Sequence, residues 1–206
     1  MKVIAIVGNK GGAGKTTLSL NIANGLNRRF KTAIIDADPQ GSSLQWRAFG
    51  SDDSADVYGI TENLRDQLNE LKSQYDAVII DCPPSVHAEQ TNLALEVSDH
   101  ALIPVQPSPV DLWATVHIEQ AVERAQVINP QLKPLLVINQ LEPRTMLSKI
   151  VREAVNEIGL PVADAVIRRR AVFRSSALEG KSIYDVGRRG DAAVEELEQL
   201  IQEFMQ

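Results

Sequence analysis

The chain has 206 residues, of which 44% are hydrophobic and 23% charged, a composition typical of a folded domain and not of a disordered chain. The single cysteine, Cys82, excludes an intramolecular disulfide and a thiolate-rich zinc site, and no apolar run is long enough to cross a bilayer. The net charge of −6 hides a basic segment, because residues 144–189 hold 10 Lys and Arg against 5 Asp and Glu. We expect one cytoplasmic domain over residues 1–206 with a local basic patch.

Short aliphatic runs alternate with amphipathic segments along most of the chain. The runs are strand-sized and lie at residues 2–7, 32–35, 77–80, 101–105 and 135–138. Apolar residues three and four apart predict helices over 16–29, 64–72, 112–128 and 148–158. A polar loop is expected over 51–56, and an apolar stripe near the C-terminus predicts a helix packed on the sheet. The alternation favours right-handed βαβ units in a doubly wound α/β fold with a mostly parallel sheet.

The first predicted strand runs directly into the sequence NKGGAGKTT at residues 9–17, which an amphipathic helix follows. Glycines permit a tight turn and let backbone N–H groups approach phosphate oxygens, while the helix N-terminus adds unpaired N–H donors. Lys15 can supply a positive charge to the β- and γ-phosphates, and the Thr16 hydroxyl can ligate Mg²⁺. Asn9 stands where GxxxxGK[ST] has its first glycine. The pattern predicts a nucleoside triphosphate site.

The additional lysine of this loop, Lys10, makes it resemble the deviant Walker A motif of the ParA/MinD ATPases. The resemblance extends from residue 2 to about residue 187 and implies a P-loop NTPase fold that uses ATP and Mg²⁺. It implies that Lys10 reaches the nucleotide bound to the other subunit of a sandwich dimer. The alternative for Lys10 is a solvated lysine on a loop.

Two strand ends carry carboxylates that resemble further motifs of this family. In the sequence DADPQG, Asp36 and Asp38 are two residues apart, so they lie on one side if the chain stays extended. Asp36 is placed to hold the Mg²⁺ shell and Asp38 to orient the attacking water or accept its proton. Asp81 ends another aliphatic strand, where a magnesium-associated carboxylate belongs. Cys82 is expected to be a small buried filler.

The resemblance therefore implies three sets of site residues. The catalytic set is Lys10, Lys15 and Asp38, and the metal set is Thr16, Asp36 and Asp81. The ATP-binding set is Lys10, Gly11, Gly12, Ala13, Gly14, Lys15, Thr16, Thr17, Pro107 and Asn139. The Asn139 amide can pair with an adenine edge, although simple capping of its strand is the alternative. Trp113 is as consistent with the core as with an interface.

The basic segment contains Arg168, Arg169, Arg170 and Arg174, in a sequence that resembles the C-terminal region of ParA. Arginine suits phosphate, and no base-reading motif is present, so we expect contacts to nonspecific DNA through its backbone. Alternatives are a solvated basic face, contacts to the nucleotide or dimer, and a DNA surface at Lys181, Arg188 and Arg189.

The sequence thus predicts a ParA-like ATPase that forms a homodimer with ATP, binds the nucleoid and positions a plasmid, chromosome or other cargo. A ParB-like adaptor or other cargo protein would stimulate hydrolysis. The alternative is a MinD-like ATPase switch at the membrane. We expect no membrane partner, because the predicted C-terminal helix carries Glu195, Glu196, Glu198 and Glu203 but no Lys or Arg, and anionic lipid would repel it.

Overall fold

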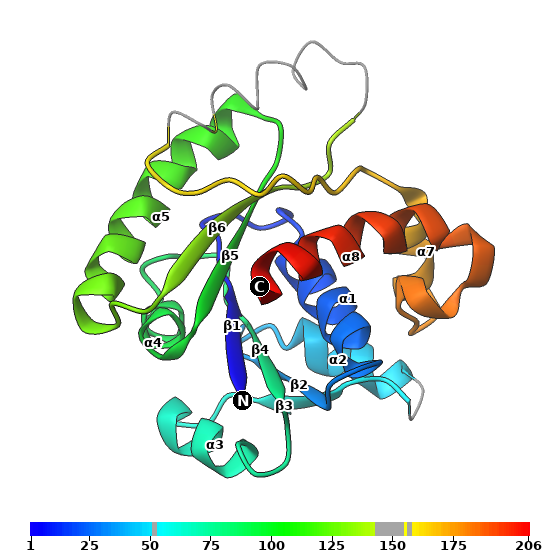
Figure 1. Ribbon diagram of the computed structural model, residues 1–206, viewed down its shortest axis with the longest axis horizontal. Coiled ribbons are helices and arrows are strands. Elements are labelled where there is room, and N and C mark those ends of the chain that lie inside the picture. The colour runs from blue at the N-terminus through cyan, green and yellow to red at the C-terminus, as the bar shows by residue number, and fades with distance from the viewer. Residues whose placement is uncertain (51–52, 143–154, 156–157) are drawn as a thin grey trace.

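A computed structural model describes residues 1–50, 53–142, 155 and 158–206, without the side chains of 109–116 (Figure 1). Six parallel strands form one sheet in the order β3-β2-β4-β1-β5-β6. The strands are β1 (Lys2–Ile6), β2 (Thr32–Asp36), β3 (Asp56–Gly59), β4 (Ala77–Asp81), β5 (His100–Val105) and β6 (Lys133–Ile138). The predicted doubly wound α/β architecture is confirmed.

Helices cover both faces of this sheet (Figure 1). They are α1 (Lys15–Asn27), α2 (Ser42–Phe49), α3 (Leu64–Leu71), α4 (Glu89–Val97), α5 (Pro109–Ile128), α7 (Ala171–Leu178) and α8 (Asp191–Met205), with 3₁₀ turns at Ile183–Asp185 and Gly187–Arg189. Alternate strand residues face opposite layers. Val3 and Ala5 of β1 belong to the core under α3, α4 and α5, whereas Ile4 and Ile6 belong to the core under α1, α7 and α8.

All five predicted strands are confirmed, but β3 was not predicted, and the polar loop expected over 51–56 ends where β3 begins. Predicted helices over 16–29, 64–72 and 112–128 correspond to α1, α3 and α5. The helix predicted over 148–158 falls largely outside the described residues. Helices α2, α4 and α7 were not predicted. In the part of the chain that the structure describes, no helix is long and apolar enough to span a membrane.

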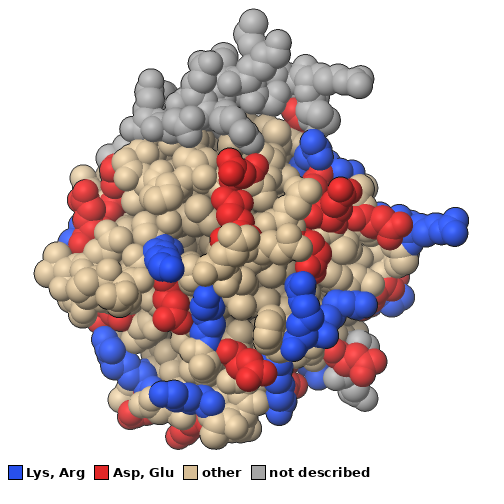
Figure 2. All heavy atoms as spheres, viewed as in Figure 1, with Lys and Arg blue, Asp and Glu red and all other residues tan. Residues whose placement is uncertain are grey.

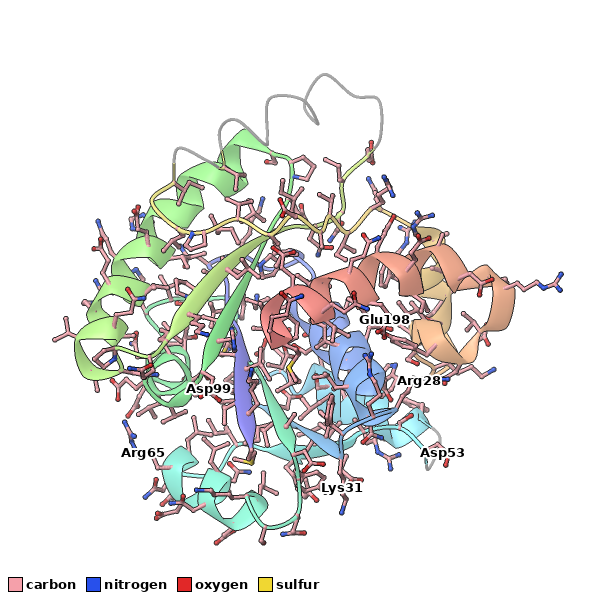
Figure 3. All side chains as sticks on the ribbon, viewed as in Figure 1. Arg28, Lys31, Asp53, Arg65, Asp99 and Glu198 are labelled. Carbon is pink, nitrogen blue, oxygen red and sulfur yellow. The ribbon has the colours of Figure 1, made fainter. Side chains whose placement is uncertain are left out.

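The C-terminal helix packs on the sheet as predicted, because Leu197, Leu200 and Phe204 of α8 are buried in the core. Three of its glutamates also bind the body of the protein. Glu203 accepts hydrogen bonds from the backbone at residues 164 and 165. Glu198, on the side of α8 that faces α1 (Figure 3), accepts from the side chains of Arg29 and Tyr184. Glu196 is buried beneath two arginines. The acidic side of this helix is therefore part of the tertiary structure.

The topology brings polar residues together at the carboxyl edge of the sheet. The strand order reverses at β1, which pairs with β4 on one side and with β5 on the other. In open α/β sheets such a switch point forms the crevice in which ligands bind. The glycine-rich loop follows β1, carboxylates end β2 and β4, and side-chain amides follow β5 and β6.

Candidate nucleotide site

The loop between β1 and α1 has the backbone conformation of a phosphate cradle. Gly12 and Gly14 have φ of +81° and +94°, in the left-handed region that favours glycine. A Cβ atom at Gly14 would lie 2.4 Å from Nδ2 of Asn139, so only glycine fits this close approach. A Cβ atom at Gly11 or Gly12 would meet nothing within 4 Å, so this side of the loop is open. Successive N–H groups in such a turn, next to a helix N-terminus, bind anions.

Lys15, the first residue of α1, is buried and directed back toward the loop. The residue is only 7% exposed, and its Nζ donates a hydrogen bond of 3.1 Å to the Lys10 carbonyl. Burial lowers the pKa of Lys15, although the nearby Asp81 opposes this effect. A phosphate group would provide the buried ammonium with a counter-charge.

Asp36 and Asp81 are neighbours on paired strands, since they are direct register partners of β2 and β4. Asp81 is completely buried, and it accepts hydrogen bonds from the hydroxyls of Ser19 at 3.0 Å, Ser43 at 2.8 Å and Thr16. Burial raises the pKa of Asp81 to about 6 and also raises the pKa of Asp36. Both carboxylates are therefore held where their negative charge is poorly solvated.

Asp38 lies just beyond Asp36 and is only half-buried. One oxygen of Asp36 accepts from the Asp38 N–H at 3.2 Å, and the other accepts from the Leu44 N–H at 3.0 Å. The Asp38 Oδ1 atom accepts from the Gln40 N–H at 3.0 Å. The two carboxylates predicted to act together thus share one turn, with Asp38 the more accessible to water.

These side chains fit a Mg²⁺ ion bound with a nucleotide. Mg²⁺ prefers oxygen ligands, and it usually takes one or two carboxylates with phosphate oxygens and water. Asp36, Asp81 and the Thr16 hydroxyl offer such oxygen atoms next to the phosphate loop. Among the described residues no group of three or more His, Cys, Asp or Glu could hold a metal, so a Mg²⁺ ion here would need further oxygen ligands from the nucleotide and from water.

Side-chain amides that follow β5 and β6 hold the carbonyls of the loop. The Gly12 carbonyl accepts from Nε2 of Gln106 at 2.5 Å and from Nε2 of Gln140 at 2.9 Å. The Ala13 carbonyl accepts from Nδ2 of Asn139 at 2.7 Å. Asn139 was predicted to approach the adenine, and here its amide contacts the loop. The half-buried Pro107 follows Gln106, so the chain at Pro107 passes close to the loop.

The sequence did not reveal four of these polar residues: Ser19, Ser43, Gln106 and Gln140. The two serines bind Asp81, and the two glutamines bind the loop. Lys10 is exposed on the loop. Cys82 is buried, as expected, and burial raises the pKa of its thiol. The Trp113 side chain lies outside the described part of the chain.

The arginine segment, defined here as residues 168–170, lies beside the nucleotide loop. It runs next to the end of β6, since the N–H of Arg169 donates to the Leu141 carbonyl. A cavity of about 140 Å³ is lined by Gly14, Thr17, Asn139 and Gln140 together with Arg168, Arg169, Arg170 and Arg174. All four predicted DNA-binding residues are therefore close to the P-loop.

Three of these arginines pair with acidic side chains. Arg168 and Arg170 both bind the buried Glu196, at 2.5 and 2.6 Å, and Arg169 binds Glu142 at 2.5 Å. In Figure 2, Lys and Arg are interspersed with Asp and Glu over the face shown, without one continuous basic patch. The arginine segment is thus partly neutralised within the chain.

Comparisons with known proteins agree with this geometry. The family model for the CobQ/CobB/MinD/ParA nucleotide binding domain matches residues 4–183. The chain is 39% identical to the maintenance of carboxysome distribution protein A of Halothiobacillus neapolitanus, covering 98% of this chain and 95% of the relative. It is 27% identical to the chromosome partitioning protein ParA of Caulobacter vibrioides, covering 94% and 91%.

A solved structure has the same fold. The ATP complex of a Cyanothece McdA variant superposes with a TM-score of 0.83 at 17% identity, covering 100% of this chain and 96% of that one. At this level of identity the likeness concerns the fold alone.

Proposed function

The chain belongs to the CobQ/CobB/MinD/ParA nucleotide-binding family, and we propose that it is a ParA-type ATPase whose ATP-bound dimer attaches to DNA and positions an intracellular cargo. The proposal rests on one observation: a lysine and three carboxylates lie together beside a glycine-rich loop that also contains Lys10. These residues are Lys15, Asp36, Asp38 and Asp81. This arrangement suits the hydrolysis of a nucleoside triphosphate.

Each residue of the site has a distinct role in this proposal. The N–H groups of the loop and the Lys15 ammonium bind the phosphate chain and neutralise its charge. Thr16, Asp36 and Asp81 hold Mg²⁺, which when bound supplies further positive charge to the phosphates. The half-buried Asp38 carboxylate orients the attacking water and accepts its proton. Lys10 is exposed on the loop, so it can reach a nucleotide on a second subunit.

For attachment to DNA, the ion pairs divide the candidate arginines into two groups. Arg168 and Arg170 share the buried Glu196, and a DNA phosphate would have to compete with that carboxylate. The pair of Arg169 with Glu142 is exposed on both sides, and such pairs are worth little, so a phosphate can replace Glu142. Arg174 is exposed. Arg169 and Arg174 are therefore the stronger candidates.

We infer that the cargo is a carboxysome or a similar protein compartment, since the relative that is 39% identical over nearly its whole length is named for carboxysome distribution. A cargo-bound adaptor would stimulate hydrolysis and release the dimer from DNA. In the source cell, deleting the gene should cluster the carboxysomes and leave chromosome and plasmid inheritance unchanged. Lost plasmids with evenly spaced carboxysomes would favour partition as the function instead.

Three substitutions test the biochemical proposal. Lys15→Ala should abolish ATP binding in calorimetry, because the loop loses its buried cation. Lys10→Ala should keep ATP binding but lose the dimer that light scattering detects with ATP and Mg²⁺. Asp38→Ala should bind ATP, dimerise and remain on DNA, while phosphate release slows.

The controls for this experiment separate the site from the fold. Without nucleotide, Lys10→Ala and Asp38→Ala should unfold at the temperature of the wild type, and Lys15→Ala should still unfold cooperatively. Equal ATP affinity in Lys15→Ala and wild type would refute the phosphate site. Co-sedimentation with liposomes instead of DNA in the presence of ATP would favour a membrane switch.

A further inference from the structure

The three amides that hold the phosphate loop come from segments far from it in sequence. Gln106 follows β5, and Asn139 and Gln140 follow β6, yet all three donate to two consecutive carbonyls, those of Gly12 and Ala13. Two donors converge on the single Gly12 oxygen. A carbonyl oxygen has two lone pairs, so the Gly12 oxygen can accept both hydrogen bonds at once.

The stereochemistry of the peptide bond gives these contacts a consequence. In a trans peptide the C=O of one residue and the N–H of the next point in opposite directions within one plane. No cis peptide bond occurs in the part of the chain that the structure describes. By drawing the Gly12 carbonyl toward themselves, Gln106 and Gln140 turn the Ala13 N–H away from them. Asn139 does the same for the Gly14 N–H through the Ala13 carbonyl.

The backbone is strained at Gln140, one of the residues that make this contact. Gln140 has a φ of 57°, the one positive φ among the non-glycine residues that the structure describes. Such a conformation is costly for a residue with a side chain, and it often marks a functional position. The Gln140 N–H donates to Oδ1 of Asn139 at 2.9 Å, so the amide nitrogen of Asn139 is left to face the loop. The strained residue therefore orients both amides.

We propose that Gln106 and Gln140, together with Asn139, are positioning residues that form an amide clamp. The clamp fixes the peptide groups of residues 12–14 so that the N–H groups of Ala13 and Gly14 face a phosphate before it binds. Binding then requires no rotation of these peptides, and affinity for the phosphate chain rises. The inference deepens the proposed function and rests on it, since the ligand is the triphosphate of the same site.

The test replaces the donors with an isosteric apolar side chain. Gln106→Met and Gln140→Met should each weaken ATP binding about threefold, because the remaining amide still holds the Gly12 carbonyl. The double variant should weaken it about thirtyfold, more than the product of the two, because both donors serve one acceptor. Gln126→Met is the matched control. Gln126 lies on α5, and its amide also donates to a backbone carbonyl, that of Leu132. It should bind ATP as the wild type does.

A second ligand without a nucleoside shows whether the glutamines act through the phosphate loop or through contacts to the base and ribose. Calorimetry with inorganic tripolyphosphate should show the same loss of affinity in the double variant as calorimetry with ATP. A loss for ATP alone would mean that the glutamines contact the base or ribose, and would overturn the clamp, as would unchanged affinity for both ligands. If the wild type binds neither ligand, the proposed function itself fails.

Two further measurements sharpen the test. In the nucleotide-free protein, the amides of residues 13 and 14 should exchange hydrogen faster in the double variant than in the Gln126→Met control. Gln140→Gly removes the amide and also relieves the positive φ, so it should keep or raise the unfolding temperature while it weakens tripolyphosphate binding. Unchanged exchange, or a Gln140→Gly variant that binds as well as the wild type, would contradict the clamp.

Discussion

The nucleotide site and the arginine segment lie side by side at the carboxyl edge of the sheet. They differ in whether their buried charged groups have enough counter-charge within the chain. In the nucleotide site, burial lowers the pKa of Lys15 and raises that of Asp81, so both shift toward their neutral forms. Burial also raises the pKa of Glu196, but hydrogen bonds from Arg170 and Arg168 outweigh it, and the net pKa of Glu196 is lowered. The pKa of Arg170 is raised by its hydrogen bond to Glu196.

The difference shows which region favours a ligand. In the nucleotide site the charged groups are desolvated without enough opposite charge, so they cost stability that a bound ligand can recover. In the arginine segment the buried charge already has its counter-charge within the chain. Sequence motifs predicted ligands for both regions; the buried charges support this for the nucleotide site, but not for Arg168 and Arg170, which already share Glu196.

The largest effect on stability is expected at Glu196. Glu196→Ala should lower the free energy of unfolding by roughly 2 to 3 kcal/mol, because a buried carboxylate that accepts from two arginines is lost. Urea unfolding at pH 7 measures the change. The neighbouring Glu195→Ala, at a less buried position, is the control and should stay within about 0.5 kcal/mol of the wild type. A similar small change for Glu196→Ala would mean that the arginines are held only weakly.

Removing the buried carboxylate of Asp81 should have the opposite effect on stability, and this effect should grow as the pH rises. The pKa of Asp81 in the fold is about 6, above its ordinary value of 3.8, so the folded state keeps a proton that the unfolded state loses between these values. The titration of Asp81 by itself should therefore lower the stability of the wild type as the pH rises from about 4 to 6. Asp81→Asn lacks this titration, so its stability relative to the wild type should increase by roughly 2 kcal/mol over that range.

The measurement is urea unfolding at several pH values with EDTA and without nucleotide. Only the difference between variant and wild type is used, because other carboxylates titrate in the same range. A difference that does not change with pH would show that Asp81 is adequately solvated in the fold. Asp81→Asn should also weaken the binding of ATP with Mg²⁺, so stability and ligand affinity should change in opposite directions.

The sequence predicted the central strands well, because β1, β2, β4 and β5 are aliphatic runs buried on both faces. It missed β3, an edge strand of four residues (DVYG) that is only partly buried and therefore lacks an aliphatic run. It also missed α2, whose single core aromatic, Trp46, gives no helical periodicity. Short elements with one buried contact leave too weak a pattern to detect.

The site was predictable only where a motif fixes the residue type at a fixed spacing. Lys15, Thr16 and Asp81 satisfy such a motif, and the structure brings them together. Ser43 and Gln140 reach the site through tertiary contacts with partners 38 and 128 residues away, and no local pattern marks them. In the same way, the pairing of Arg168 with Glu196 depends on how α8 packs, so a count of charges could not predict it.

A smaller effect is expected at Ser43, which connects α2 to the nucleotide site. Ser43→Ala should lower the free energy of unfolding by roughly 1.5 to 2 kcal/mol, because the buried Asp81 loses a charge-assisted hydrogen bond of 2.8 Å. In an Asp81→Asn background the same change should cost less. Ser42→Ala, one residue earlier and only half-buried, is the control. Equal costs in both backgrounds would show that Ser43 acts through packing alone.

The smallest effect on stability is expected at Arg174, and it tests whether the arginines differ in their availability to DNA. Arg174 is exposed on α7, so Arg174→Ala should change the free energy of unfolding by less than about 0.5 kcal/mol. If Arg174 binds a DNA phosphate, its loss should flatten the slope of log K against log salt by about 0.9 per subunit. Fluorescence anisotropy with nonspecific duplex DNA, ATP and Mg²⁺ over a range of NaCl concentrations measures this slope. Arg168→Ala should flatten the slope less than Arg174→Ala does, because Arg168 already shares the carboxylate of Glu196 with Arg170. If Arg168→Ala flattens the slope as much as Arg174→Ala does, the ion pair of Arg168 with Glu196 breaks when DNA binds. The arginine segment would then favour a ligand as the nucleotide site does, in spite of its ion pairs within the chain.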